Sequence, residues 1–166
     1  MDEISLSLII FRYIPEIIIV VSLSLVLTGY EPKMKNVVLI AVVGAPIIAV
    51  VRYFTPIPGI NTIIVLPVLI LLIVYFCKID VVSSIIVSGL GLIIVGMTEI
   101  ATIFAATKLI GIDINIALAD PIQKLLLPLP EYVFLILLII VCRRYHLVLL
   151  NVRELNDLRW FNDHER

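Results

Sequence analysis

The sequence predicts an all-α, polytopic membrane protein, a helical bundle of about five transmembrane helices with a C-terminal cytoplasmic helix. Of its 166 residues, 62% are apolar, and the mean hydropathy is +1.21. Only 15% are charged, against about 25% in an average soluble domain. This composition excludes a soluble globular domain, a disordered chain and a nucleic-acid-binding module.

The predicted spans follow from the apolar runs. A bilayer core of about 30 Å needs roughly 20 apolar residues per helix. Five runs meet or approach this length, at residues 4–28, 37–53, 60–77, 81–107 and 128–147. The fourth run is long enough to cross the bilayer at a tilt. The strictly apolar part of the fifth run is too short to span, so the predicted helix includes residues that flank it. Residues 1–145 are therefore interpreted as a transmembrane domain in the lipid bilayer.

The basic residues predict an orientation, because Lys and Arg near span ends favour the cytoplasm. A cytoplasmic C-terminus places eight basic residues inside: Lys33, Lys35, Lys78, Arg143, Arg144, Arg153, Arg159 and Arg166. It leaves only Arg52, Lys108 and Lys124 outside. We therefore expect a multi-pass protein of the plasma membrane, with its N-terminus outside and its C-terminus in the cytoplasm.

Four ionisable residues lie in or near the predicted spans: Arg12, Glu16, Arg52 and Glu99. Such groups are costly in lipid and usually face the bundle interior at functional sites. All four fall in the predicted outer half of the bilayer, which indicates a ligand-binding or gating pocket for an external carboxylate or amine. In the alternative interpretation, the arginines snorkel to the interface and Glu99 has a structural partner. We expect that partner to be Arg52, with Arg12 second.

Small residues predict close packing of the fourth span. They form a stripe of serines and glycines at Ser83, Ser84, Ser88, Gly89, Gly91 and Gly96. Pro15, Pro46 and Pro67 lie inside spans, where each removes a helical hydrogen bond and can kink the helix.

The tail, residues 146–166, is predicted to be an amphipathic cytoplasmic signalling helix or linker. Val148, Val152 and Leu155 begin an apolar stripe at helical spacing. No Gly or Pro occurs from residue 131 to 166, so we expect the last span to continue unbroken into the tail. The stripe would then join two copies in a parallel homodimer; the alternative is a membrane-surface anchor.

The sequence carries no recognisable chemistry. No nucleotide-binding, metal-binding or nucleophile motif occurs, so no catalytic residue, metal or cofactor is predicted. The two cysteines, Cys77 and Cys142, lie in apolar runs without metal-ligand spacing and are expected to be reduced packing residues.

Several local patterns resemble a known family. Residues 56–62 (PIPGINT) lead into a span that ends Phe76-Cys77-Lys78, the next span contains Thr98-Glu99-Ile100, and the final helix is bounded by prolines and ends in basic residues. Over residues 55–145 the chain resembles the membrane sensor region of Firmicutes histidine kinases with a GHKL-type ATPase core. That group includes the quorum-sensing kinases of the accessory gene regulator type and the sporulation-related sensors.

The resemblance implies the input domain of a two-component kinase. Such a domain perceives an extracellular or membrane-borne ligand, such as a small molecule or a peptide, and relays it through the last helix. A cytoplasmic kinase core and a response regulator would have to be supplied beyond this chain. The alternative function is a small substrate-binding membrane subunit of an uptake transporter, and a membrane enzyme is a third possibility that lacks clustered catalytic residues.

Overall fold

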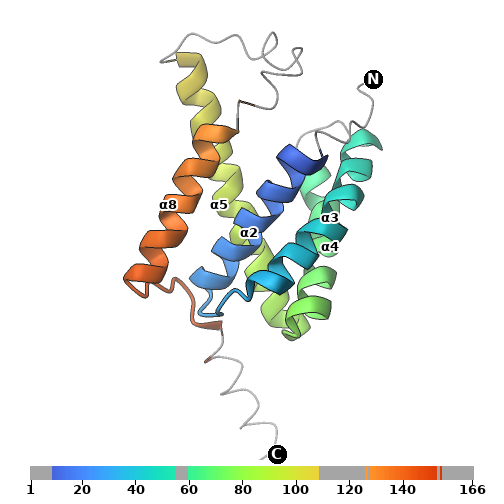
Figure 1. Cartoon of the computed structure of the whole chain (residues 1–166), viewed down its shortest axis with the longest axis vertical. Coiled ribbons are helices and arrows are strands. Elements are labelled where there is room, and N and C mark those ends of the chain that lie inside the picture. The colour runs from blue at the N-terminus through green and yellow to red at the C-terminus, as the bar shows by residue number, and fades with distance from the viewer. Residues whose placement is uncertain (1–8, 55–59, 109–125, 127, 153, 155–166) are drawn as a thin grey trace, which may run out of the picture.

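The computed structural model describes residues 9–54, 60–108, 126, 128–152 and 154 (Figure 1). In chain order the elements are a short π-helix, η1 (Ile9–Tyr13), and the helices α2 (Ile14–Leu27), α3 (Met34–Phe54), α4 (Ile60–Cys77), α5 (Val81–Lys108) and α8 (Leu129–Arg144). The described chain contains no strand, which agrees with the predicted all-α class. The helices occupy the five predicted apolar runs.

Three helical segments are long and apolar enough to cross a membrane: Ile9–Leu27, Met34–Phe54 and Val81–Ala105. These segments fit the predicted membrane location. Helices α4 and α8 are shorter, with 18 and 16 residues.

Helix α2 is the centre of the bundle (Figure 1). It packs against α3, α5 and α8, while α4 lies between α3 and α5. One apolar face of α2, with Ile17, Val21 and Leu25, packs into a core shared with α3 and α4. Another face, with Ile19 and Leu23, packs against α8. The all-round apolar composition of α2 is what allows one helix to be covered on several sides.

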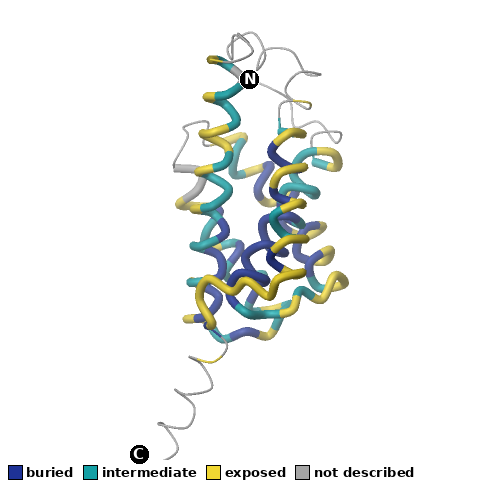
Figure 2. The backbone as a smooth tube through the Cα atoms, turned by 90° about the vertical axis from the view of Figure 1, so that its left-hand side faces the viewer, coloured by how far each residue is buried: buried dark blue, intermediate teal, exposed yellow. Residues whose placement is uncertain are grey.

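The two ends of the bundle are packed differently (Figure 2). We call the end that holds the turns 28–33, 78–80 and 145–151 the turn end, and the opposite end, where α2 and α8 begin, the cavity end. Buried residues of α5 reach from Ser83 to Gly91, near the turn end, and no described residue of α5 after Gly91 is buried. The cavity end is therefore the looser half of the molecule.

The first helix begins with a wide turn because of Pro15. Pro15 has no N–H and its ring would clash with the carbonyl four residues earlier in a regular helix. The preceding turn, Ile9–Tyr13, is accordingly π-helical, and Pro15 lies in the first turn of α2. Pro46 and Pro67 lie inside α3 and α4, which remain helical through them.

Helices end at the turn end in left-handed residues. The backbone φ is +81° at Gly29 after α2, +55° at Lys78 after α4 and +52° at His146 after α8. After α2, the N–H of Tyr30 donates to the carbonyl of Leu25 at 2.9 Å, as in a Schellman cap. After α8, the N–H of Leu147 donates to Cys142 in the same pattern, at 2.9 Å.

The expectation of an unbroken final helix is wrong. Helix α8 ends at Arg144, and the chain then turns back through His146 onto the end of α2. The N–H groups of Leu149 and Val152 donate to the carbonyls of Leu27 and Thr28 at 2.8 and 3.2 Å. These bonds satisfy carbonyls at the end of α2 that have no partner within the helix, which favours the turn over continuation.

The predicted stripe is consequently divided. Val152 is 2% exposed, packed within its own chain, whereas Val148 is exposed. Leu155 and most of the predicted signalling helix, residues 146–166, lie outside the described residues. A dimer contact through Val152 would require the docked segment to be released.

Among the glycines in the small-residue stripe of α5, Gly91 makes the close contact with another helix. A Cβ atom on Gly91 would lie 1.8 Å from Oγ of Ser24 on α2, so the two backbones approach closely there. Ser83, Ser84 and Ser88 of the same stripe are also buried. Gly89 and Gly96 face open space, so they take no part in this contact.

Asp80 caps α5 at the turn end, and its removal is our first testable prediction. The N–H of Ser83 donates to its carboxylate at 2.9 Å. Partial burial opposes ionisation, but hydrogen bonds from Ser83 and from the backbone N–H groups of Asp80 and Val82 together outweigh it and lower the pKa of Asp80 below its ordinary value of 3.8. Because the folded-state pKa is the lower one, the cap stabilises above about pH 4, and this stability is lost as pH falls through the lowered value.

We expect Asp80→Ala to lower the free energy of unfolding by about 1 kcal/mol at neutral pH, measured by denaturation in detergent micelles. Asp80→Asn is the matched control, because an amide oxygen caps a helix without titrating. It should keep most of the stability, and its free energy of unfolding should depend less on pH in the acid range. A loss in the Asn variant as large as in the Ala variant would contradict the capping role.

Candidate functional site

Charged side chains from four helical segments meet at the cavity end. They line a polar cavity of about 30 Å³. Its charged residues are Arg12, Glu16, Arg52, Glu99 and Glu131. The first four are the residues singled out from the sequence, so the structure brings all of them to one site.

A two-pronged ion pair in the polar cavity joins Arg52 of α3 to Glu16 of α2. Nη2 of Arg52 donates to Oε1 of Glu16 at 2.6 Å, and Nη1 donates to Oε2 at 3.2 Å. The two side chains are 29% and 22% exposed. The guanidinium also lies over the ring of Tyr13, 5.0 Å from its centroid. A two-pronged contact of this kind fixes both geometry and charge.

The expected pair between Arg52 and Glu99 is therefore corrected. The fork of Arg52 is occupied by Glu16, and Glu99 makes no ion pair within 4 Å in the described part of the chain. Glu99 is exposed and lies on the rim of the polar cavity. Its carboxylate is thus the one most accessible to a group that approaches from this end.

Glu131 is a site residue that the sequence interpretation missed. It lies in the first turn of α8, is only 7% exposed, and accepts a hydrogen bond from the hydroxyl of Thr98 on α5 at 3.0 Å. An acidic residue just after Pro130 reads as an ordinary favourable charge at a helix N-terminus. Its partner Thr98 lies on the same helix as Glu99, which was the only available signal.

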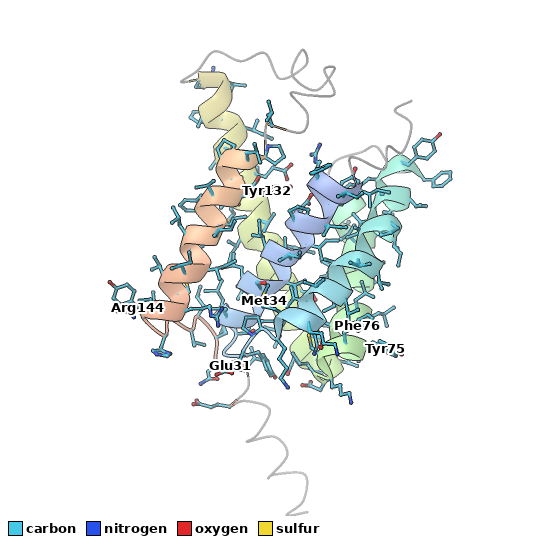
Figure 3. All side chains as sticks on the ribbon, in the orientation of Figure 1. Glu31, Met34, Tyr75, Phe76, Tyr132 and Arg144 are labelled. Atoms are coloured by element: carbon cyan, nitrogen blue, oxygen red, sulfur yellow. The ribbon has the colours of Figure 1, made fainter. Side chains whose placement is uncertain are left out.

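Tyr132 connects α8 to the first helix. Its hydroxyl donates to the backbone carbonyl of Arg12 at 3.1 Å, within the π-helical turn. Figure 3 shows Tyr132 on the side of α8 that faces α2 at the cavity end. Together, the Tyr132 and Glu131 bonds attach the start of α8 to both η1 and α5.

Chemically, the polar cavity combines three carboxylates with two guanidinium groups in an otherwise apolar wall. Its volume accepts water molecules or a group of the size of an ammonium ion. No group of three or more His, Cys, Asp or Glu side chains that could hold a metal ion is found in the described segments. The arrangement can bind and exchange small charged groups.

No protein-family model, no curated protein and no solved structure matches this chain.

Proposed function

We propose that the chain is a membrane-embedded input domain of a two-component signalling kinase, which perceives an extracellular or membrane-borne ligand at the polar cavity. The observation that carries the proposal is the position of α8. Its first turn contributes Glu131 and Tyr132 to the cavity, and its last turn leads into the segment docked on α2. One helix therefore links the charged site to the opposite end of the bundle.

The orientation belongs to the same proposal. All five apolar runs would cross the membrane, with the cavity end outside and the turn end in the cytoplasm. The excess of Lys and Arg in the segments at the turn end supports this orientation. The C-terminal segment would then lead toward a cytoplasmic kinase core and its response regulator.

The ligand is inferred from the accessible charge. Glu99 on the rim would meet a cationic group first, such as the amine of a peptide or a small molecule, while Arg52 is held by Glu16. Only the charged group would enter, because the polar cavity has about 30 Å³ of space. The remainder of the ligand would lie at the membrane surface.

The transporter alternative is less well supported. Small-molecule sites usually have volumes of roughly 300–1,000 Å³ and enclose most of the ligand. The polar cavity is far smaller, so it does not suit a vitamin-sized substrate. A homodimer remains part of the sensor proposal, but its contact would use lipid-facing surfaces of the helices and not Val152, which is buried in its own chain.

The native thiol of Cys142 provides the test, since it is buried at the far end of α8 from Glu131. In a Cys77→Ser background, Tyr132→Phe removes the bond to Arg12. One such bond contributes about 1 kcal/mol, so we expect a roughly fivefold faster reaction of Cys142 with a thiol reagent in reconstituted vesicles. Glu131→Gln should act in the same direction.

Thr107→Val is the matched control, because the Thr107 hydroxyl bonds only within its own helix at the same end. It should leave the labelling rate unchanged. Equal rates for Tyr132→Phe and the control, with both variants folded, would overturn the proposed relay. A membrane-impermeant reagent should reach Cys142 in inside-out vesicles and not in intact cells; the reverse would overturn the orientation.

A further inference from the structure

A second and larger cavity opens at the turn end, far from the charged site. Its volume is about 370 Å³, within the range of sites that hold small molecules. It lies between the turn after α2, from Gly29 to Pro32, and the end of α8, from Cys142 to Val148. We call it the turn-end cavity. Neither the polar cavity nor the relay through Glu131 and Tyr132 uses it.

Hydrogen-bond donors on one side and a carboxylate on the other face this turn-end cavity. Arg143 and His146 line it from the end of α8, and Glu31 lines it from the turn after α2. Within the described chain, no ion pair within 4 Å joins Arg143 to Glu31. Figure 3 places Glu31 and the end of α8, marked by Arg144, at the same end of the bundle. The space between them is therefore suited to a molecule that carries both charges.

The rest of the wall is apolar, with Val26, Leu147 and Val148. These residues lie where two helices of a membrane-embedded bundle end, which is the depth of the lipid headgroups. Tyr30 also lines the space, and tyrosine is enriched at this interface. An occupant with a polar head and an apolar body would match both parts of the wall. Basic pockets between helices at a membrane surface are known to bind lipid headgroups.

We propose that the turn-end cavity binds the headgroup of a membrane phospholipid that carries both a phosphate and a primary amine. The phosphate contacts Arg143 and His146, whose side chains donate hydrogen bonds. The ammonium contacts Glu31, and the start of the acyl region lies against Val26 and Leu147. A purely anionic headgroup would face the Glu31 carboxylate, and a quaternary amine would have no hydrogen to donate to it. This inference goes beyond the proposed function and needs only the membrane location.

The test is native mass spectrometry of the full chain in mild detergent, titrated with dioleoyl lipids. Phosphatidylethanolamine should form a one-to-one adduct at lower concentration than phosphatidylcholine or phosphatidylglycerol. Arg143→Gln should weaken this adduct by about tenfold or more. Arg144→Gln is the matched control, because it removes the neighbouring exposed arginine, which does not line the cavity, and it should change binding by less than about twofold.

Glu31→Gln should abolish the preference for phosphatidylethanolamine over phosphatidylglycerol. Glu31 and Arg143 are exposed, so their variants are expected to fold, and circular dichroism without added lipid checks this. Equal losses in the two arginine variants, or equal binding of all three lipids, would overturn the proposal. Binding of free phosphoethanolamine as tight as that of the lipid would overturn a lipid occupant in favour of a soluble one. No signalling readout is involved, so this result is independent of the proposed sensor function.

Discussion

Replacing Arg52 by Gln should destabilise the fold by about 2–3 kcal/mol, because it leaves the Glu16 carboxylate partly buried and uncompensated. Breaking a fully buried pair typically costs roughly 3–5 kcal/mol. We expect a smaller effect because the two side chains are 29% and 22% exposed. Denaturation in detergent micelles, followed by circular dichroism, measures the change.

Two further variants test whether the cost arises from the pair. Glu16→Gln combined with Arg52→Gln should be more stable than Arg52→Gln alone, because no unpaired charge is left. Arg52→Lys should lie between wild type and Arg52→Gln, since lysine keeps the charge but loses the two-pronged contact and the stacking on Tyr13. Strictly additive losses in the double variant would contradict a direct interaction.

Gly91→Ala should have the second large effect. The added Cβ would lie 1.8 Å from Oγ of Ser24, so α2 and α5 must separate or Ser24 must shift. Ser24 is buried, and its hydroxyl donates to the carbonyl of Val20 at 2.6 Å, which restricts its movement. Overpacking of this kind costs about 1–3 kcal/mol, measured by the same denaturation assay.

Gly89→Ala is the control on the same helix. A Cβ there meets no atom within 4 Å, so only helix propensity changes. Alanine is favoured over glycine inside a helix by roughly 0.5–1 kcal/mol, and this variant should be neutral or slightly stabilised. If both alanine variants behaved alike, the close approach of α2 and α5 at Gly91 would not exist.

The positions of the helices could be predicted from the sequence because the apolar runs and their lengths can be read directly from the order of the residues. The run at 60–77 and the helix Ile60–Cys77 coincide, and the other runs differ from their helices by a few residues at the ends that the structure describes. The predicted start of the first run, at residue 4, lies outside the described residues. The gathering of Arg12, Glu16, Arg52 and Glu99 at one end followed from their depth in successive spans. Neither prediction depends on the rotation of a helix about its own axis.

Predicting which side chains pair requires the rotation of each helix about its own axis. The sequence alone does not provide this rotation. Helices that are apolar on nearly every side, such as α2 and α4, give no face from which to deduce neighbours. The partner of Arg52 was therefore assigned to Glu99 by depth, although Glu16 on the adjacent helix takes both of its amino groups. Glu131 was overlooked because, of the five apolar runs, the fifth has the least clearly marked ends in the sequence.

The end of α8 escaped prediction for a different reason. No Gly or Pro marks it, and His146 adopts its positive φ because the following segment finds unsatisfied carbonyls at Leu27 and Thr28. This stop signal lies more than a hundred residues away in the chain. Local propensity could not reveal it, since tertiary contacts override propensity at helix ends.

Helix α8 and the segment after it are tied to the first helix at two points. The hydroxyl of Tyr132, in the first turn of α8, donates to the carbonyl of Arg12 in η1, and the N–H of Leu149 donates to the carbonyl of Leu27 in α2. A piston-like slide would break both ties together. A pivot about the Leu27 contact would break only the first. Because 16 residues of helix span about 24 Å, a small tilt at this fulcrum becomes a wide swing at the cavity end. Helix α8 would therefore transmit a change of angle, with little displacement along its axis, to the residues that follow Val152.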